Sequence, residues 1–70
     1  MRHFEYKDLG MNSHKFWEIS LIANKVITKY GRVGIKNPAQ TEKSFASKDQ
    51  AKNYCEKKIR EKISKGYLES

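Results

Sequence analysis

The chain has 70 residues, which fits a single domain over residues 1–70, and carries a net charge of +7 from fifteen basic and eight acidic residues. Its single cysteine, Cys55, excludes a disulfide within the chain. No apolar run approaches the roughly 20 residues that span a bilayer, and the N-terminus has no apolar signal core, so we expect a cytoplasmic protein. The charge indicates a polyanionic partner, either nucleic acid or an anionic membrane surface, and of the two we expect nucleic acid.

The first half of the chain alternates apolar and polar residues with the period of two that is typical of strands. We predict strands over Arg2–Lys7, Lys15–Ile22 and Lys25–Val33. Residues 8–13 supply a turn between the first two strands. Residues 23–25 supply a tight hairpin turn between the second and the third, since asparagine at position 24 tolerates the left-handed conformation.

The second predicted strand contains the clearest core pattern. Trp17, Ile19 and Leu21 share one parity and therefore one face, which makes Trp17 a core residue. Phe16 points to the opposite face.

The second half of the chain predicts a loop, one more strand and a helix. Residues 34–39 form the loop, and Gln40–Ala46 forms a polar strand at the edge of the sheet. Ser47 and Gln50 have the spacing of a capping box at the start of a helix over Lys48–Lys65, which Gly66 ends. Residues 67–69 form a last short strand. The sum is an α+β fold, an antiparallel sheet of four to five strands with one amphipathic helix packed on it.

The predicted helix has an apolar stripe and a charged outer face. The stripe consists of Ala51, Tyr54, Cys55, Ile59 and Ile63. Lys58 and Lys62 flank the stripe and extend from it to solvent. On the outer face, i,i+4 ion pairs are expected for Glu56–Arg60, Lys57–Glu61 and Glu61–Lys65, which favours a solvated surface over a binding surface.

No catalytic constellation is visible in the sequence. His3 and His14 lie in separate elements without ligand spacing, so we expect surface histidines rather than metal ligands. Cys55 has apolar neighbours that disfavour the thiolate, which indicates a structural thiol. The stretch from Gly31 to Gly34 lacks the spacing of a phosphate-binding loop. We predict no enzyme activity, no cofactor and no metal.

The third predicted strand ends in a cluster of aromatic and basic residues around Gly31, a glycine that indicates a bulge or a close backbone approach. An aromatic ring at Tyr30 can stack on a base or ribose, and Arg32 can pair with a phosphate. Lys29 and Lys36 add positive charge. The alternative, which the spacing leaves open, is that Tyr30 packs in the sheet and Arg32 forms an internal salt bridge.

Four stretches, in order, resemble a WGR domain, the module named for its Trp-Gly-Arg triplet. They are MRHFEY, KFWEISL, NKVITKYGRVG and KSFASKDQAKNYCEKKIREKISKGYLE, and they cover nearly the whole chain. Such domains occur in DNA-dependent poly(ADP-ribose) polymerases and in many bacterial proteins. The resemblance implies a bacterial protein connected with DNA damage, with a natural N-terminus at the initial methionine.

In the polymerases, the signature tryptophan stacks at the ribose end of a broken strand, and the signature arginine contributes to the DNA-bound arrangement of domains. The resemblance implies these roles for Tyr30 and Arg32, with Gly31 allowing close approach. Tyr30 departs from the family tryptophan, because it has less ring area and adds a hydroxyl. The loop over residues 35–39 also differs from the usual glycine-rich connection.

The resemblance therefore implies a non-enzymatic domain that binds nucleic acid, DNA rather than RNA, at ends, nicks or other discontinuities. Lys29, Lys36 and Lys15 would support Tyr30 and Arg32 at the phosphates. The alternative is a protein–protein interaction or regulatory module that keeps the fold without binding DNA. We expect a monomer in either case.

Overall fold

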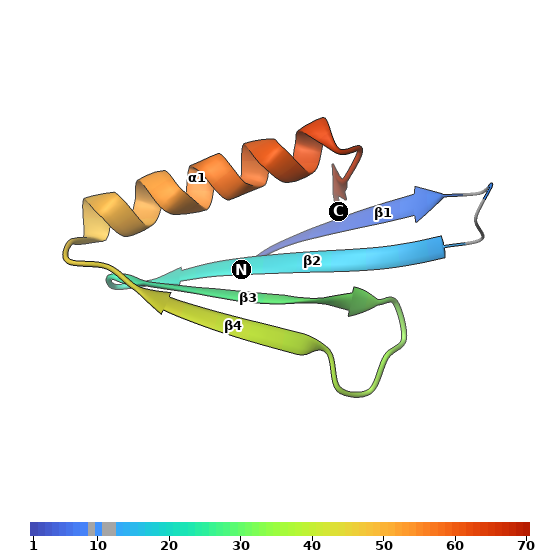
Figure 1. Cartoon of the computed structure of the whole chain (residues 1–70), viewed down its shortest axis with the longest axis horizontal. Coiled ribbons are helices and arrows are strands. Elements are labelled where there is room, and N and C mark those ends of the chain that lie inside the picture. Colours follow the sequence, from blue (N-terminus) through green and yellow to red (C-terminus); the bar gives the residue numbers. More distant parts are fainter. Residues whose placement is uncertain (9, 11–12) are drawn as a thin grey trace.

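The computed structural model describes residues 1–8, 10 and 13–70, so the predicted turn at residues 8–13 lies partly outside the described residues. The elements are β1 (Arg2–Asp8), β2 (Ser13–Ile22), β3 (Lys25–Arg32), β4 (Ala39–Ser44), α1 (Lys48–Ser64) and β5 (Leu68–Glu69). The strands of the described chain form one sheet in the order β4-β3-β2-β1-β5, with antiparallel neighbours. The helix lies over one face of the sheet (Figure 1), which confirms the predicted α+β fold.

The register places different side chains on the two faces of the sheet. Trp17 lies directly opposite Phe4 on β1 and Tyr30 on β3, so these three side chains share the face toward α1. Trp17 is only 4% exposed, which confirms that it belongs to the core. The buried core between this face and α1 consists of Phe4, Trp17, Ile19, Val26, Ala51 and Ile59.

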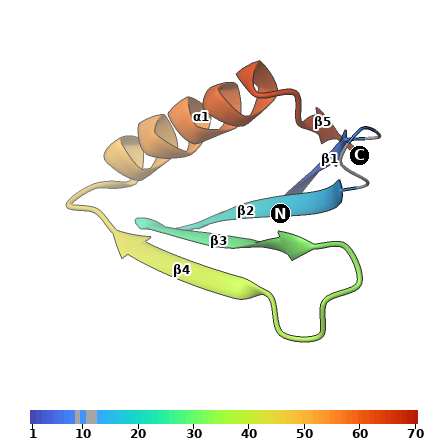
Figure 2. The same ribbon diagram turned by 45° about the vertical axis from the view of Figure 1, so that its right-hand side comes forward.

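The helix begins as the sequence predicts and departs from the prediction near its end. Ser47 Oγ accepts a hydrogen bond from the backbone N–H of Gln50 at 3.2 Å. Among the described residues, the side chain of Gln50 does not return a bond to Ser47. Ile63, predicted on the apolar stripe, is 53% exposed. Figure 2 shows the reason, because α1 rises away from the sheet toward its C-terminal end.

The three ion pairs predicted for the outer face of α1 are not formed. In the described part of the chain, the ion pair within α1 joins Lys58 Nζ to Glu61 Oε1 at 3.4 Å. Lys58 also lies over the ring of Tyr54, 5.5 Å from its centroid. Exposed pairs contribute only about 0.3–0.5 kcal/mol, too little to hold two long side chains in one geometry. The basic residues of the outer face, Lys57, Arg60 and Lys65, therefore keep their charge uncompensated.

The hairpin between β2 and β3 closes through a two-residue turn, since Ile22 pairs with Lys25. The left-handed residue is Ala23, with φ of 54°, and not Asn24 as predicted. Asn24 instead secures the chain after β4, because its carbonyl oxygen accepts from the N–H of Phe45 and its side-chain amide donates to the carbonyl oxygen of Phe45. An alanine in this conformation costs roughly 1–2 kcal/mol, since its Cβ crowds the following carbonyl.

The face of the sheet turned away from α1, here called the open face, carries a chain of histidines and glutamates. The ring nitrogens of His3 lie 2.7 Å from Glu18 and 2.8 Å from Glu5, and His14 lies 2.7 Å from Glu5. Because carboxylates only accept hydrogen bonds, His3 is an imidazolium that donates from both nitrogens. The bond to Glu5 and then the bond to Glu18 raise the pKa of His3. The two histidines predicted as separate surface residues are thus partly buried and joined through Glu5.

Replacing the left-handed alanine tests the turn. We expect Ala23→Gly to raise the free energy of unfolding by about 1 kcal/mol, because glycine adopts positive φ without crowding. For a domain of this size that gain raises Tm by about 4–8 °C. Ala39→Gly is the matched control in the exposed strand β4, where φ is not positive, and it should lower stability by about 0.5–1 kcal/mol. Equal losses for both variants, measured by thermal unfolding, would contradict the assignment.

The histidine chain predicts a pH dependence of stability. A pKa of His3 raised above the ordinary value of about 6.5 gives a stabilisation that is fully present below that value. The stabilisation is lost as the pH rises through the raised pKa of the folded state. Urea unfolding between about pH 5.5 and about pH 8 should therefore show stability falling with pH, and His3→Gln should flatten this slope. If His3→Gln keeps the parental slope, the imidazolium assignment is wrong.

Candidate nucleic-acid interface

Tyr30 stands at the border of the core without being covered by it. Its position opposite Trp17 places its ring on the α1 side of the sheet. Its other neighbour is Ala39 on β4, which has too small a side chain to cover the ring. Tyr30 is 44% exposed, while Trp17 beside it is buried. One side of the Tyr30 ring system thus remains available to a ligand.

Two cations face each other next to Tyr30. Lys15 on β2 and Arg32 on β3 are directly opposite partners on the same face of the sheet. Like charges in this arrangement are destabilising. In the part of the chain that the structure describes, neither side chain forms an ion pair, so the internal salt bridge considered for Arg32 is not formed. An anion bound between them would relieve the repulsion.

Gly31 leaves little space for a side chain. A Cβ at this position would lie 3.2 Å from Cγ2 of Ile35 and 3.8 Å from Cε1 of Phe16. Its missing side chain points to the open face, since Gly31 pairs with Phe16. The close approach at Gly31 is therefore made by Ile35, which folds back from the following loop.

The end of α1 adds two residues that the sequence did not single out for the site. Tyr67 N–H donates to the carbonyl oxygen of Lys62 and Gly66 N–H to that of Ile63, both at 3.0 Å, which is a Schellman motif. Gly66 has φ of 102°, and a Cβ there would lie 3.1 Å from the ring of Tyr6. The motif turns the Tyr67 ring beneath Lys62, whose ammonium lies 5.0 Å from the ring centroid.

These elements border a pocket of about 310 Å³ at the end of β3, and we call it the signature pocket. Four of the six predicted site residues line it, together with Phe16, Lys62 and Tyr67. The four are Lys15, Tyr30, Gly31 and Arg32.

The other two predicted site residues lie elsewhere. Lys29 has the opposite parity to Tyr30 and pairs with Glu18, so it belongs to the open face. Lys36 lies in the exposed connection between β3 and β4. Neither lines the signature pocket. The alternation of the strand already separates Lys29 from Tyr30, whereas the position of Lys36 depends on the loop.

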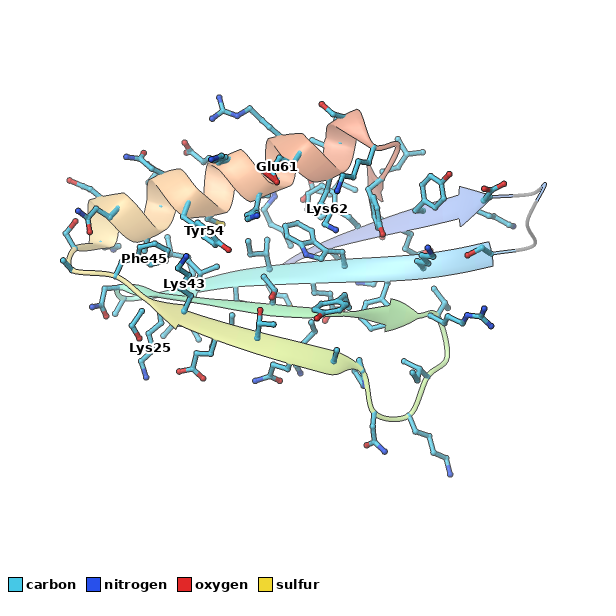
Figure 3. All side chains as sticks on the ribbon, in the orientation of Figure 1. Lys25, Lys43, Phe45, Tyr54, Glu61 and Lys62 are labelled. Carbon is cyan, nitrogen blue, oxygen red and sulfur yellow. The ribbon has the colours of Figure 1, made fainter. Side chains whose placement is uncertain are left out.

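Lys62 is the most constrained cation of the signature pocket. Burial, and then the charges of Lys65 and Lys58, lower its pKa. Its ammonium lies 5.6 Å from the ring of Trp17, on the inner side of α1, and Figure 3 shows the side chain directed beneath the helix. The sequence signal for Lys62 was its place beside the apolar stripe, and that for Tyr67 was its place directly after Gly66.

Other chemistry finds less support in the described residues. They contain no group of three or more histidine, cysteine or acidic side chains arranged to hold a metal ion. Burial raises the pKa of the Cys55 thiol, which agrees with a structural cysteine packed against the core. Over the same residues, no helix has the length and apolarity needed to cross a membrane.

Comparison with known proteins identifies the family. The sequence profile of the WGR domain matches residues 1–70. Protein YehF of Escherichia coli (strain K12) is 41% identical over 69 residues, which are 99% of this chain and 24% of YehF. A crystal structure of a Bacteroides fragilis protein superposes with a TM-score of 0.90 at 36% identity, covering 99% of this chain and 19% of that chain. The chain thus spans about a quarter or less of these relatives, and it belongs to the WGR domain family.

Proposed function

We propose that this domain binds DNA at ends, nicks or other discontinuities in preference to intact duplex. Membership of the WGR family supports a module of the nucleic-acid-binding type, and a WGR domain alone is non-catalytic. The observation that carries the proposal is the signature pocket. It combines the half-exposed ring of Tyr30 with Lys15 and Arg32, two cations that form no ion pair among the described residues.

The preference for discontinuities follows from the half-exposed ring of Tyr30 at the signature pocket. In an intact duplex the base faces are stacked on one another, and only phosphates and groove edges are accessible. The ring can therefore stack on a base or sugar only where a break exposes one. Arg32, Lys15 and Lys62 then lie within the same pocket to meet the phosphate next to the break. By their resemblance to the family motif, Tyr30 and Arg32 are assigned the roles of the signature tryptophan and arginine.

Sequence-specific recognition is not part of the proposal. The basic side chains on the outer face of α1 lie without an aromatic partner on that surface, in a shallow depression formed by Lys57, Arg60, Glu61, Ser64 and Lys65. Such a surface attracts phosphates of any sequence. We assign it a general electrostatic contribution to binding.

A protein-interaction role is the second candidate, and the open face favours it. Within residues 1–8, 10 and 13–70, no helix or strand covers this face, and it carries a groove lined in part by Met1, Ile22 and Ile27. Met1 is 82% and Ile22 57% exposed. The domain also makes up only 24% and 19% of the two related proteins, so in those chains it works beside other segments. Nuclease-resistant capture of a partner that Ile22→Lys abolishes would support this role.

DNA binding is tested by fluorescence anisotropy with three forms of one sequence: a covalently closed circle, the same circle with one nick, and a recessed linear duplex. We expect tighter binding to the nicked and recessed forms, and affinity that falls as salt rises from about 50 to about 200 mM. The double variant Tyr30→Ala/Arg32→Ala should lose about 5- to 150-fold for the nicked form, which corresponds to the loss of one stacked base.

The control is Lys57→Ala/Arg60→Ala on the outer face of α1. It should weaken binding to all three forms equally and preserve the preference for the nick. Unchanged binding of nicked DNA by the Tyr30→Ala/Arg32→Ala variant would contradict the site, and equal binding of all forms by the parent would contradict the preference.

The repulsion between Lys15 and Arg32 predicts that a substitution of Arg32 weakens DNA binding without lowering the stability of the fold. We expect Arg32→Gln to leave the free energy of unfolding unchanged or to raise it by about 0.2–1 kcal/mol at low salt, because it removes a like-charge pair. High salt should cancel the gain. Lys25→Gln is the control, since it breaks the 3.1 Å pair with Glu42 and should be neutral or slightly destabilising. Marked destabilisation by Arg32→Gln in urea unfolding would instead make Arg32 a structural residue.

A further inference from the structure

A second cavity lies deeper, between α1 and the sheet, and we call it the inner cavity. Its volume is about 220 Å³, and its lining residues are Trp17, Thr28, Tyr30, Tyr54, Lys58 and Lys62. Tyr30 and Lys62 also line the signature pocket. The two cavities are therefore neighbours that share these two residues.

The chemistry of the inner cavity is unusual for a hollow beneath a helix. Three aromatic rings form its walls, Lys58 and Lys62 project into it, and no carboxylate is among the described residues that line it. Figure 3 shows Tyr54 and Lys62 directed from α1 into the space above the sheet. Lys58 already pairs with Glu61 at 3.4 Å, and Lys62 lies over the rings of Trp17 and Tyr67. A purely apolar ligand would shield both ammonium groups further from water, which is costly. A ligand with both an aromatic ring and hydrogen-bond acceptors satisfies both kinds of group.

Tyr54 is held in place for such a role. Its ring packs on Phe45 with centroids 5.0 Å apart. Lys43 and Lys58 lie 4.9 Å and 5.5 Å from the Tyr54 centroid. These contacts fix the ring while its hydroxyl end and its remaining surface border the cavity. Lys58 and Lys62 line the cavity, and Lys43 adds a positive charge next to Tyr54.

We propose that the inner cavity accepts one unpaired nucleobase from the end of a DNA strand, stacked against the aromatic walls, while the adjoining phosphate lies between Lys62 and Arg32. This rests on the proposed function, which supplies the strand end. Lys58 donates to an acceptor on the base edge. The volume fits one ring system and is smaller than the roughly 300–1,000 Å³ of sites for larger ligands. The domain would therefore recognise the unpaired nucleotide as well as the break.

The test compares two duplexes with a single open end, the other end being closed by a base-free glycol linker. One carries an unpaired nucleotide at the open end, and the other carries an abasic residue there, with the same number of phosphates. Both overhang polarities are measured by anisotropy. We expect the base-bearing overhang to bind about 5- to 150-fold more tightly at one polarity or both. The salt dependence of the two duplexes should be the same, since their charges are equal.

Single substitutions test whether the inner cavity causes this difference in affinity. Tyr54→Leu should bring the ratio of affinities for the base-bearing and abasic duplexes close to one, and Tyr54→Phe should restore it. Lys58→Gln should lower the ratio, whereas Lys57→Gln, the same change of charge on the outer face, should not. Trp17 is the single tryptophan of the chain and lines the cavity. In the unmodified protein, the fluorescence emission of Trp17 should therefore change when the base-bearing duplex binds and not when the abasic duplex binds. This measurement does not depend on whether the variants fold.

Equal affinity for the two duplexes, with no difference in Trp17 emission, would overturn this inference. If both still bind more tightly than a closed circle, the proposed preference for ends stands alone. If neither does, both proposals fail. Binding of a free deoxynucleoside monophosphate shows whether the base must belong to a DNA strand. If the free nucleotide binds as tightly as the base-bearing end, the cavity binds free nucleotides and the assignment to a strand end is wrong.

Discussion

The antiparallel register of β2 and β3 is the constraint on which the candidate site depends. It sets Trp17 opposite Tyr30 and Lys15 opposite Arg32. The core requires Trp17 to point toward α1, and the alternation of β3 then sends Tyr30 and Arg32 to the same face. A slip of β3 by one residue would move both to the open face and take Val26 out of the core. Burial of the core therefore also orients the residues of the signature pocket.

The helix completes the site through the way it ends. The Schellman motif at Gly66 reverses the chain and brings Tyr67 under Lys62. The short strand β5 then returns to β1, where Glu69 forms a two-point ion pair with Arg2. Toward its C-terminal end α1 diverges from the sheet, and side chains occupy the space between the helix and the sheet. The same divergence leaves room for the signature pocket and the inner cavity.

The two faces of the sheet divide the charge. Glu5, Glu18 and Glu42 lie on the open face, where they bind His3, His14 and Lys25. Glu69 of β5 shares the face of Phe4 and pairs with Arg2. The signature pocket has cations and no carboxylate among its described lining residues. Three cations, Lys15, Arg32 and Lys62, thus lie where the ring of Tyr30 is also exposed. That combination distinguishes a candidate binding surface from general basicity.

Local patterns in the sequence determined the elements, the Ser47 cap, the core position of Trp17 and the cluster around Gly31, because each depends on near neighbours and on a period of two or 3.6 residues. Only the tertiary structure decided which cations gather at Tyr30. Lys29 lies outside the signature pocket, as the alternation of β3 already implies. Lys62 at the end of α1 and Tyr67 after it join the pocket, although both are more than thirty residues from Tyr30 in the sequence. The tertiary structure also joined His3 to His14 and gave positive φ to Ala23 rather than Asn24. These outcomes depend on register, on helix tilt and on contacts between distant segments, none of which a local pattern contains.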